Sequence, residues 1–168
     1  LNVNFKGRKM KKYIIQAFCV MIGLTLLSSC AKSPELTVLG VINFPQTFQS
    51  SANTVTITAD NDSVEKIDFN WQPVNYGIEA AVTYSLQFDL PSDTAGASGW
   101  GKAQEVIVGD DLLTKSIMYY ELNKIAINGL GLEPGIAAKM VVRAKSFVDR
   151  NAYSNAIALD VTPWVAPV

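Results

Sequence analysis

The side chains best suited to covalent chemistry in this 168-residue chain are two cysteines, Cys19 and Cys30, and the chain contains no histidine. Without histidine, the Ser-His-Asp and Cys-His arrangements cannot form, and the commonest metal ligand is missing. A glycosidase needs two carboxylates held about 5–9.5 Å apart in a cleft, and no acidic pair here differs from ordinary surface charge. We therefore predict no catalytic residue, no cofactor and no metal site, and we expect that the protein is not an enzyme.

One acidic turn could still bind a cation. The stretch ADNDS (residues 59–63) places Asp60, Asn61 and Asp62 together, and calcium takes oxygen ligands from such loops. Calcium needs about six or more ligands, however, and no EF-hand spacing is present. We favour a plain turn in which these side chains bond to the local backbone.

Cys30 ends a short stretch that comes after a cationic segment and then an apolar one. Lys11 and Lys12 precede an apolar run from Tyr13 to Leu27. This run is shorter than the ~20 residues that a spanning helix needs, and the pattern is typical of a secretory signal peptide. The stretch LSSC (residues 27–30) has an aliphatic residue, two small residues and a cysteine. It resembles the lipobox of bacterial lipoproteins, in which the cysteine sulfur receives a diacylglycerol.

These features divide the first part of the chain. We predict a signal peptide over residues 1–29, with Met10 as the true start, and a lipidated tether over residues 30–35. Lipidation at Cys30 would attach the protein to a membrane, because two or three acyl chains anchor stably where one does not. An uncleaved signal anchor, or a secretory signal with a chance cysteine, remains the alternative.

Charge is distributed unevenly along the sequence. Five of the 14 cations and none of the 15 acids precede Cys30, so the remainder has a net charge near −6. Nucleic-acid binding requires clustered cations that replace phosphate counterions. The acidic body therefore excludes a nucleic-acid partner.

After the tether, period-2 alternation of apolar and polar residues dominates and predicts strands. The clearest is VTYSLQFDL (82–90), whose polar row we expect to face water, as antiparallel sheets allow. In IAAKMVVRAKSFV (136–148) we expect Ile136 in the buried row and Arg143 in water. The other predicted strands are LTVLGVINF (36–44), TVTITAD (54–60), KIDFNWQP (66–73), QEVIVG (104–109), KSIMYY (115–120) and NAIALDVTP (155–163).

A single segment has helical rather than strand spacing. Leu122, Ile125 and Ala126 recur at helical intervals, and Gly129 stands where a left-handed residue would end the helix. We predict an all-β fold: an immunoglobulin- or fibronectin-III-like β-sandwich over residues 36–163, with seven to eight antiparallel strands and one short helix.

Three stretches of this predicted sandwich resemble the N-terminal domain of the SusE family, lipoproteins of starch-utilisation systems in the Gram-negative outer membrane. They are FNWQPVNYGIEAAVTYSLQFD (69–89), YYELNKIAINGLGLEPGIAAKMVVRAKS (119–146) and YSNAIALDVTP (153–163). The resemblance implies a lipid-anchored outer membrane protein on the cell surface or the periplasmic face. It also implies a starch-like polysaccharide as ligand, and a TonB-dependent porin and other glycan-binding lipoproteins as partners.

The resemblance also limits what can be transferred to this chain. In that family the glycan sites lie in further domains after this one, whereas residues 164–168 read as a truncated linker. We therefore expect a fragment, a truncated product or a short relative. The domain itself would be a spacer and docking module. The alternative is a surface adhesion or assembly module without glycan binding, which adds a partner strand at the edge of LTVLGVINF.

Three aromatic residues are candidates for stacking on a glycan. Trp100 lies between Gly99 and Gly101 in a long predicted loop, and flat aromatic rings bind sugar faces much as they stack bases. The alternative is that Trp100 folds back to cover the rim of the sandwich. Tyr76 and Tyr119 are weaker candidates of the same kind, with rim packing as the alternative.

Overall fold

The computed structural model describes residues 40–165, so the predicted signal peptide, Cys30 and residues 166–168 lie outside the described part. Contacts divide the chain into a unit of residues 1–40 and a unit of residues 41–168. The strands of the described chain all belong to the second unit. Within residues 40–165, no helix is both long and apolar enough to cross a lipid bilayer.

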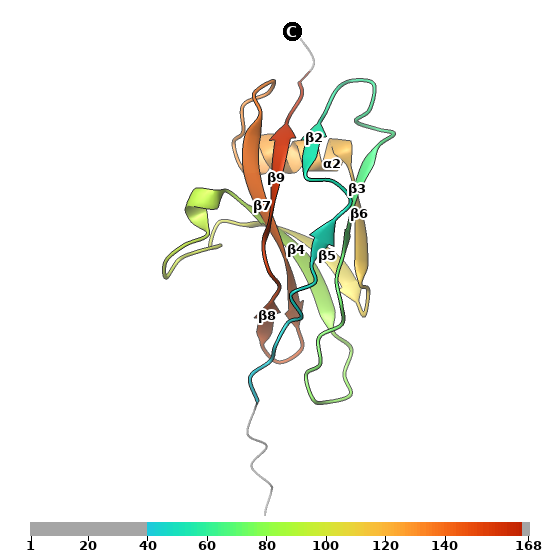
Figure 1. Cartoon of the computed structure of the whole chain (residues 1–168), viewed down its shortest axis with the longest axis vertical. Coiled ribbons are helices and arrows are strands. Elements are labelled where there is room, and N and C mark those ends of the chain that lie inside the picture. Colours follow the sequence, from blue (N-terminus) through green and yellow to red (C-terminus); the bar gives the residue numbers. More distant parts are fainter. Residues whose placement is uncertain (1–39, 166–168) are drawn as a thin grey trace, which may run out of the picture. The chain divides into compact units, whose positions relative to one another are not determined.

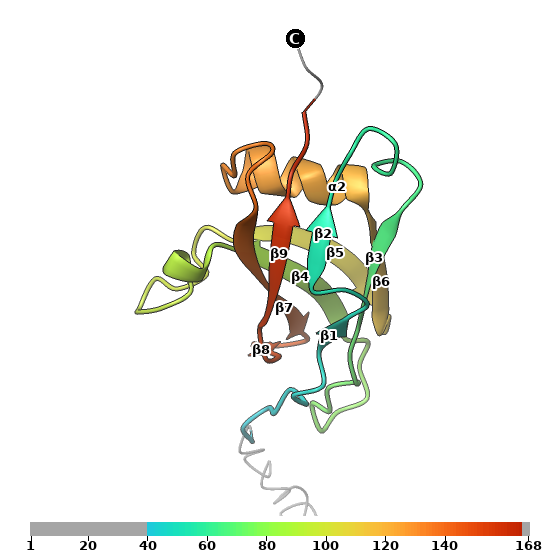
Figure 2. The same ribbon diagram turned by 45° about the horizontal axis from the view of Figure 1, so that its top comes forward.

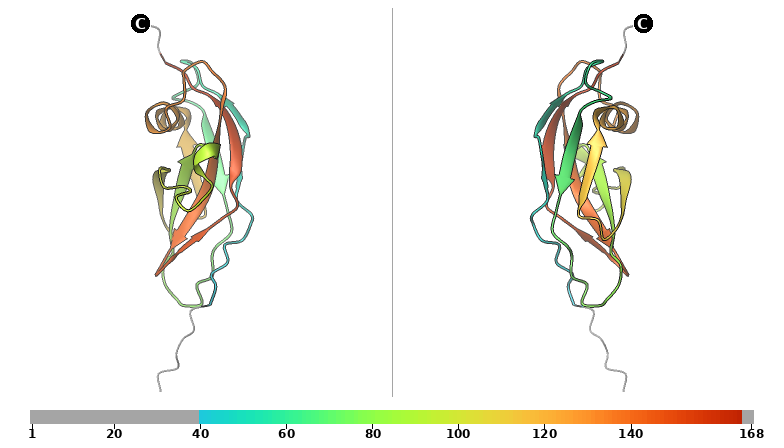
Figure 3. Two further views of the ribbon diagram at one scale, coloured as in Figure 1. Left: turned by 90° about the vertical axis from the view of Figure 1, so that its left-hand side faces the viewer. Right: turned by 90° about the vertical axis from the view of Figure 1, so that its right-hand side faces the viewer.

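The described chain folds into two facing sheets of short strands (Figures 1 and 3). One sheet has the order β1-β3-β6, and the other has the order β2-β9-β7-β4-β5, with β8 added beside β7. In chain order the strands are β1 (Gln49–Ser50), β2 (Thr54–Thr56), β3 (Lys66–Asn70), β4 (Thr83–Asp89), β5 (Gln104–Asp110), β6 (Thr114–Met118), β7 (Ala138–Phe147), β8 (Asn151–Tyr153) and β9 (Ile157–Thr162).

The prediction of an immunoglobulin- or fibronectin-III-like β-sandwich with one short helix is confirmed. Three details differ from the expectation. The described residues contain nine strands rather than seven or eight, because the two-residue β1 and the three-residue β8 are too short to show alternation. The pair β2–β9 is parallel, whereas the other pairs are antiparallel. Residues 40–44, the described part of the first predicted strand, form no strand.

The apolar rows of both sheets meet in one core, as the alternation predicts. Trp71 belongs to this core, together with two phenylalanine pairs: Phe48 stacks on Phe69 with ring centroids 5.8 Å apart, and Phe69 meets Phe88 edge-on at 5.9 Å. The Tyr84 hydroxyl, also inside, accepts a hydrogen bond from the Val74 amide at 2.9 Å. The aromatic side chains thus join the two sheets where no disulfide does within the described residues.

The helix links the two sheets across one end of the sandwich (Figure 2). It begins as α2 (Tyr119–Lys124) and continues as a π-helical turn, η3 (Ile125–Gly129). The Glu121 carboxylate accepts a hydrogen bond from the Met118 amide at 3.1 Å, which satisfies one free donor at the helix start. The predicted left-handed position is wrong by two residues: Gly131, not Gly129, has a positive φ, of 72°.

Gly129 serves a different purpose from the predicted cap. A Cβ at this position would lie 2.5 Å from Cγ of Gln104, so a larger residue would clash with the start of β5. Ile136 is also misplaced by the prediction, because it is 54% exposed in the turn before β7 begins.

Candidate functional site

The outer face of the six-stranded sheet carries a stack of three side chains from three parts of the chain. The Arg143 guanidinium carbon on β7 lies 4.1 Å from the ring centroid of Trp100 and 3.9 Å from that of Tyr153 on β8. Each contact is a cation–π interaction. The guanidinium therefore contacts two aromatic rings, one from a loop and one from the hairpin of β7 and β8.

The backbone brings these residues together through strand register. Lys145 pairs with Tyr153 across β7 and β8, and Gln87 pairs with Arg143 across β4 and β7. Residues two apart on a strand share a face, so Arg143 and Lys145 project on the same side of β7. The Arg143 Nε donates a hydrogen bond of 2.9 Å to the Gln87 side-chain oxygen, which fixes the guanidinium over β4.

Trp100 reaches the stack from the loop between β4 and β5, which projects from the sandwich (Figure 1). The loop starts with a 3₁₀ turn, η2 (Pro91–Asp93), and is closed by a hydrogen bond of 2.8 Å from the Trp100 amide to the Asp93 carbonyl. Trp100 has a φ of +65°, a left-handed conformation that costs a non-glycine residue about 1–2 kcal/mol. The loop therefore holds the indole in place against a local backbone preference.

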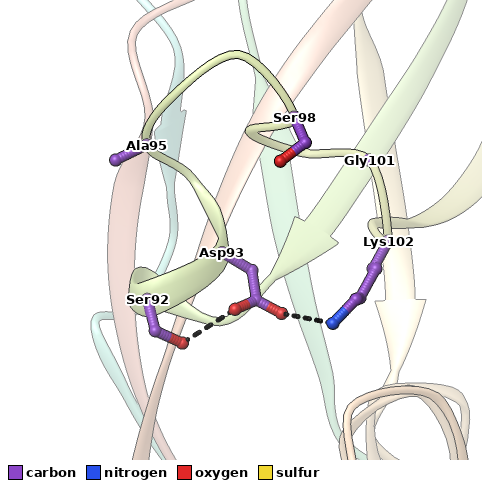
Figure 4. Close-up of a pocket in the computed structure, with 6 residues that line it drawn as sticks. All are labelled: Ser92, Asp93, Ala95, Ser98, Gly101 and Lys102. Atoms are coloured by element: carbon purple, nitrogen blue, oxygen red, sulfur yellow. Dashed lines mark hydrogen bonds and ion pairs between the residues drawn. The ribbon is translucent and has the colours of Figure 1, made fainter.

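The same loop encloses a small polar hollow of about 310 Å³ (Figure 4). The Asp93 carboxylate lies 3.8 Å from the Lys102 ammonium and accepts a hydrogen bond of 3.1 Å from the Ser92 hydroxyl. These contacts are used within the loop, and they close its two ends on each other. The polar groups around the hollow therefore stabilise the loop, and we do not assign a ligand site to it.

A second polar cluster lies beside the stack, around Glu105 on β5. Its carboxylate accepts hydrogen bonds of 2.6 Å from the Ser85 hydroxyl and of 2.9 Å from the Lys145 ammonium. Gln87 also donates to it, at 3.3 Å. Burial by itself would raise the pKa of Glu105, but the hydrogen bonds and the charge of Lys145 outweigh it and lower the pKa below its ordinary value.

Most of the polar row of β4 is buried beside these two groups, contrary to the expectation that it faces water, and only Thr83 at its start is exposed. Ser85, Gln87 and Asp89 are only 5%, 8% and 1% exposed. Glu105 of β5 bonds to Ser85 and Gln87, and Arg143 of β7 bonds to Gln87 and interacts with the charge of Asp89. Burial by long side chains of neighbouring strands cannot be read from alternation within one strand. Arg143 is likewise half-buried rather than in water, and this burial lowers the pKa of its guanidinium, with Tyr153 and Asp89 acting in the opposite direction.

The three predicted stacking residues have different surroundings. Trp100 is partly exposed, and the Arg143 guanidinium lies over its ring. Tyr76 and Tyr119 are buried, at 8% and 9% exposure, so neither offers a ring face to a ligand in this structure. The Tyr76 hydroxyl hydrogen-bonds with the Ser146 hydroxyl at 2.9 Å, and burial raises the pKa of Tyr119. Trp100 alone remains a stacking candidate, and Cys30 lies outside the described residues.

Sequence reasoning misses the partners that surround Trp100. It places Arg143 in water and gives no role to Lys145 or Tyr153. The cations do alternate with apolar residues on one strand, but only the pairing of β4, β7 and β8 shows that they lie beside Gln87 and Tyr153.

The acidic turn and the acidic side chains elsewhere add no further site. Asn61 uses its side chain to bond the local backbone, accepting from the Thr58 amide at 2.8 Å and donating to the Thr56 carbonyl at 3.0 Å. Between residues 40 and 165, no three His, Cys, Asp or Glu side chains lie where they could hold one metal ion.

Comparison with known proteins gives a family match and a structural likeness. Residues 36–145, more than half of the chain, match the family described as SusE outer membrane protein. No curated protein sequence matches the chain. Among solved structures, the crystal structure of the FN1-FN3 domains of chicken CNTN1 is similar, with 14% identity, a TM-score of 0.34 and coverage of 60% of this chain and 28% of that chain. The family match includes Trp100 and Arg143, and on its extent the chain belongs to the SusE outer membrane protein family.

Proposed function

We propose that this protein is a non-enzymatic, lipid-anchored accessory component of a complex that binds and imports a starch-like polysaccharide. The observation that carries this proposal is the match of residues 36–145 to the SusE outer membrane protein family. The lipobox-like stretch that ends at Cys30 supports attachment to the outer membrane, on its cell-surface or periplasmic side. The partners would be a TonB-dependent porin and other glycan-binding lipoproteins.

Within this complex, the sandwich would act as a spacer and docking module. The segment before β1 enters at one end of the sandwich, and the segment after β9 leaves at the other end (Figure 1). The Asn123 side chain on α2 donates to the Trp164 carbonyl at 2.7 Å and accepts from the Trp164 amide at 2.9 Å. A body whose entry and exit lie at opposite ends, with the exit segment held by the helix, is suited to the role of a rigid spacer.

Trp100 would be the residue of this domain that contacts a glycan, through the part of the ring that remains exposed. Its loop is closed by internal hydrogen bonds, so binding would require little reordering of the backbone.

The test is co-isolation of the complex from the cells that produce the protein. The full chain, tagged at its C-terminus, is extracted from outer membranes in mild detergent, and the bound proteins are identified by mass spectrometry. We expect a TonB-dependent porin and further lipoproteins, and we expect them to be lost with the Cys30→Ser variant, which cannot receive the lipid. Recovery of the wild-type chain from the outer membrane without a porin would contradict the proposal.

A further inference from the structure

A depression on the outer face of the six-stranded sheet lies beside the Trp100 stack and is separate from it. It measures about 350 Å³ and is lined by Thr83 and Ser85 of β4, Glu105 and Ile107 of β5, Lys145 and Phe147 of β7, and Asn151 of β8. Small-molecule sites in proteins usually measure about 300–1,000 Å³, so the depression has room for a small ligand or for a short part of a chain.

Strand register explains why the surface is hollow here. Ser85 lies between Ile107 and Lys145, and Thr83 lies opposite Phe147. The central strand thus contributes two small hydroxyl residues, while its neighbours contribute large ones. The small residues form a floor along β4, and the large residues form walls on both sides. We call this feature the β4 groove.

The walls of the β4 groove expose apolar surface that the fold does not use. Ile107 is 73% exposed and Phe147 is 46% exposed. In contrast to Trp100, Phe147 has no ring or guanidinium stacked on it among residues 40–165. An exposed aromatic beside a branched aliphatic residue can bury the C–H face of a flat ligand.

The polar groups that line the groove supply both donors and acceptors, and the charges among them balance. Glu105 and Lys145 form an ion pair at 2.9 Å and neutralise each other. The Asn151 side chain has no hydrogen-bond partner within the described residues, which leaves its amide available to a ligand. At the end of the groove, the Asp110 carboxylate accepts a bond of 2.7 Å from the Thr83 hydroxyl and adds negative charge.

We propose that the β4 groove binds a neutral glycan segment, with a sugar C–H face on Phe147 and its hydroxyl groups toward Asn151. A sugar ring has the apolar faces and polar rim that this combination of walls and floor fits. A polyanion would meet Asp110 and the acidic body, so the charge favours an uncharged ligand. The inference deepens the proposed function, on which it rests, and adds a glycan contact at Phe147 to the one proposed for Trp100.

The test measures binding of maltohexaose, cellohexaose and hexagalacturonate to the full chain in detergent micelles, by calorimetry and saturation-transfer NMR. We expect a neutral hexasaccharide to bind, and Phe147→Ala to weaken that binding about fivefold or more, as loss of one stacked aromatic does. Phe147→Leu, which keeps the apolar volume without the ring, should also weaken binding. Tyr120→Ala, which removes an aromatic that is 51% exposed on α2, is the matched control and should leave binding unchanged.

Three outcomes would overturn the inference: no neutral hexasaccharide binds, hexagalacturonate binds more tightly, or both Phe147 variants keep wild-type affinity, whether or not Trp100→Ala weakens binding. Far-UV circular dichroism of each variant shows whether the sandwich is intact. A negative result at the groove leaves the envelope complex of the proposed function standing, because co-isolation with a porin does not depend on glycan binding by this domain.

Discussion

From Tyr84 to Asp89, the two faces of β4 are buried to almost the same extent by different chemistry. On the inner face, Tyr84, Leu86 and Phe88 are 0–1% exposed and contact the other sheet. On the outer face, Ser85, Gln87 and Asp89 are 1–8% exposed beneath charged and aromatic side chains. The inner face is buried because apolar surface leaves water, whereas the outer face is buried because long amphipathic side chains cover polar ones.

Because the two faces are buried by different chemistry, substitutions on them should lower the free energy of unfolding by different amounts. Removing an inner side chain leaves a cavity that the surrounding sheets fill only in part. On the outer face, the long side chains that cover the polar residues can move aside and water can enter. A substitution there therefore loses only the free energy of cation–π contacts and hydrogen bonds. The outer face is therefore the part of the domain that can change without loss of the fold.

The largest expected effect comes from the inner face. Leu86→Ala should lower the free energy of unfolding by about 2–5 kcal/mol, because Leu86 is fully buried. Ser85→Ala, the neighbouring residue on the outer face, should cost about 0.5–1.5 kcal/mol through loss of its bond to Glu105. Urea denaturation of both variants measures the difference. Equal losses would show that the two faces do not differ as described.

A smaller change in the free energy of unfolding is expected for Trp100, which lies on the outer face of the six-stranded sheet. Trp100→Ala should lower the free energy of unfolding by about 1–2 kcal/mol, since it removes one ring from the Arg143 guanidinium. Trp100→Gly removes the same ring but also suits the φ of +65°, so it should be more stable than the alanine variant by about 0.5–1 kcal/mol. Thermal melts compare the two. An alanine variant at least as stable as the glycine variant would show that the backbone at this position is not strained.

The smallest effect concerns the pH dependence of the Glu105 cluster. The pKa of Glu105 is lower in the folded protein than its ordinary value of about 4.3. A carboxylate whose pKa is lowered by folding stabilises the folded protein at pH values above the pKa of the unfolded state. This stabilisation is lost as the pH falls through the pKa of the folded state.

Glu105→Gln should therefore cost under about 1 kcal/mol near pH 7, in view of the exposure of the ion pair. The cost should shrink as the pH falls below about 4. Urea midpoints between pH 3 and pH 7 for wild type and variant provide the measurement, with Glu133→Gln, an exposed residue outside the cluster, as control. A cost that stays constant over this range would show that Glu105 does not titrate differently on folding.

The inner face of β4 is predictable from the sequence, and the outer face is not. Alternation in VTYSLQFDL identifies the inward row correctly, because each residue type matches the side it occupies. The burial of Gln87, the stack on Arg143 and the β4 groove all depend on which strands are neighbours. Gln87 and Arg143 are 56 positions apart in the chain, and no local pattern contains their pairing.

The predicted site residues show the same contrast between local sequence and strand pairing. Tyr76 and Tyr119 are candidates by their residue type near strand ends, but their rings are buried, and Tyr76 bonds with Ser146. Phe147 and Asn151 escape sequence reasoning because each is unremarkable alone, and their significance arises where β7 and β8 meet. The lipobox-like stretch at Cys30 needs no tertiary contact to be identified, since a peptidase would read it as an extended peptide.

Attachment of the domain to the envelope through Cys30 is the claim on which the functional account depends most. Metabolic labelling with an alkyne fatty acid, together with fractionation of the cells, tests it directly on the full chain and on Cys30→Ser. We expect the wild-type protein to carry the label in the outer membrane fraction, and the variant to lose the label. An unlabelled wild-type protein recovered from the soluble fraction would contradict the account.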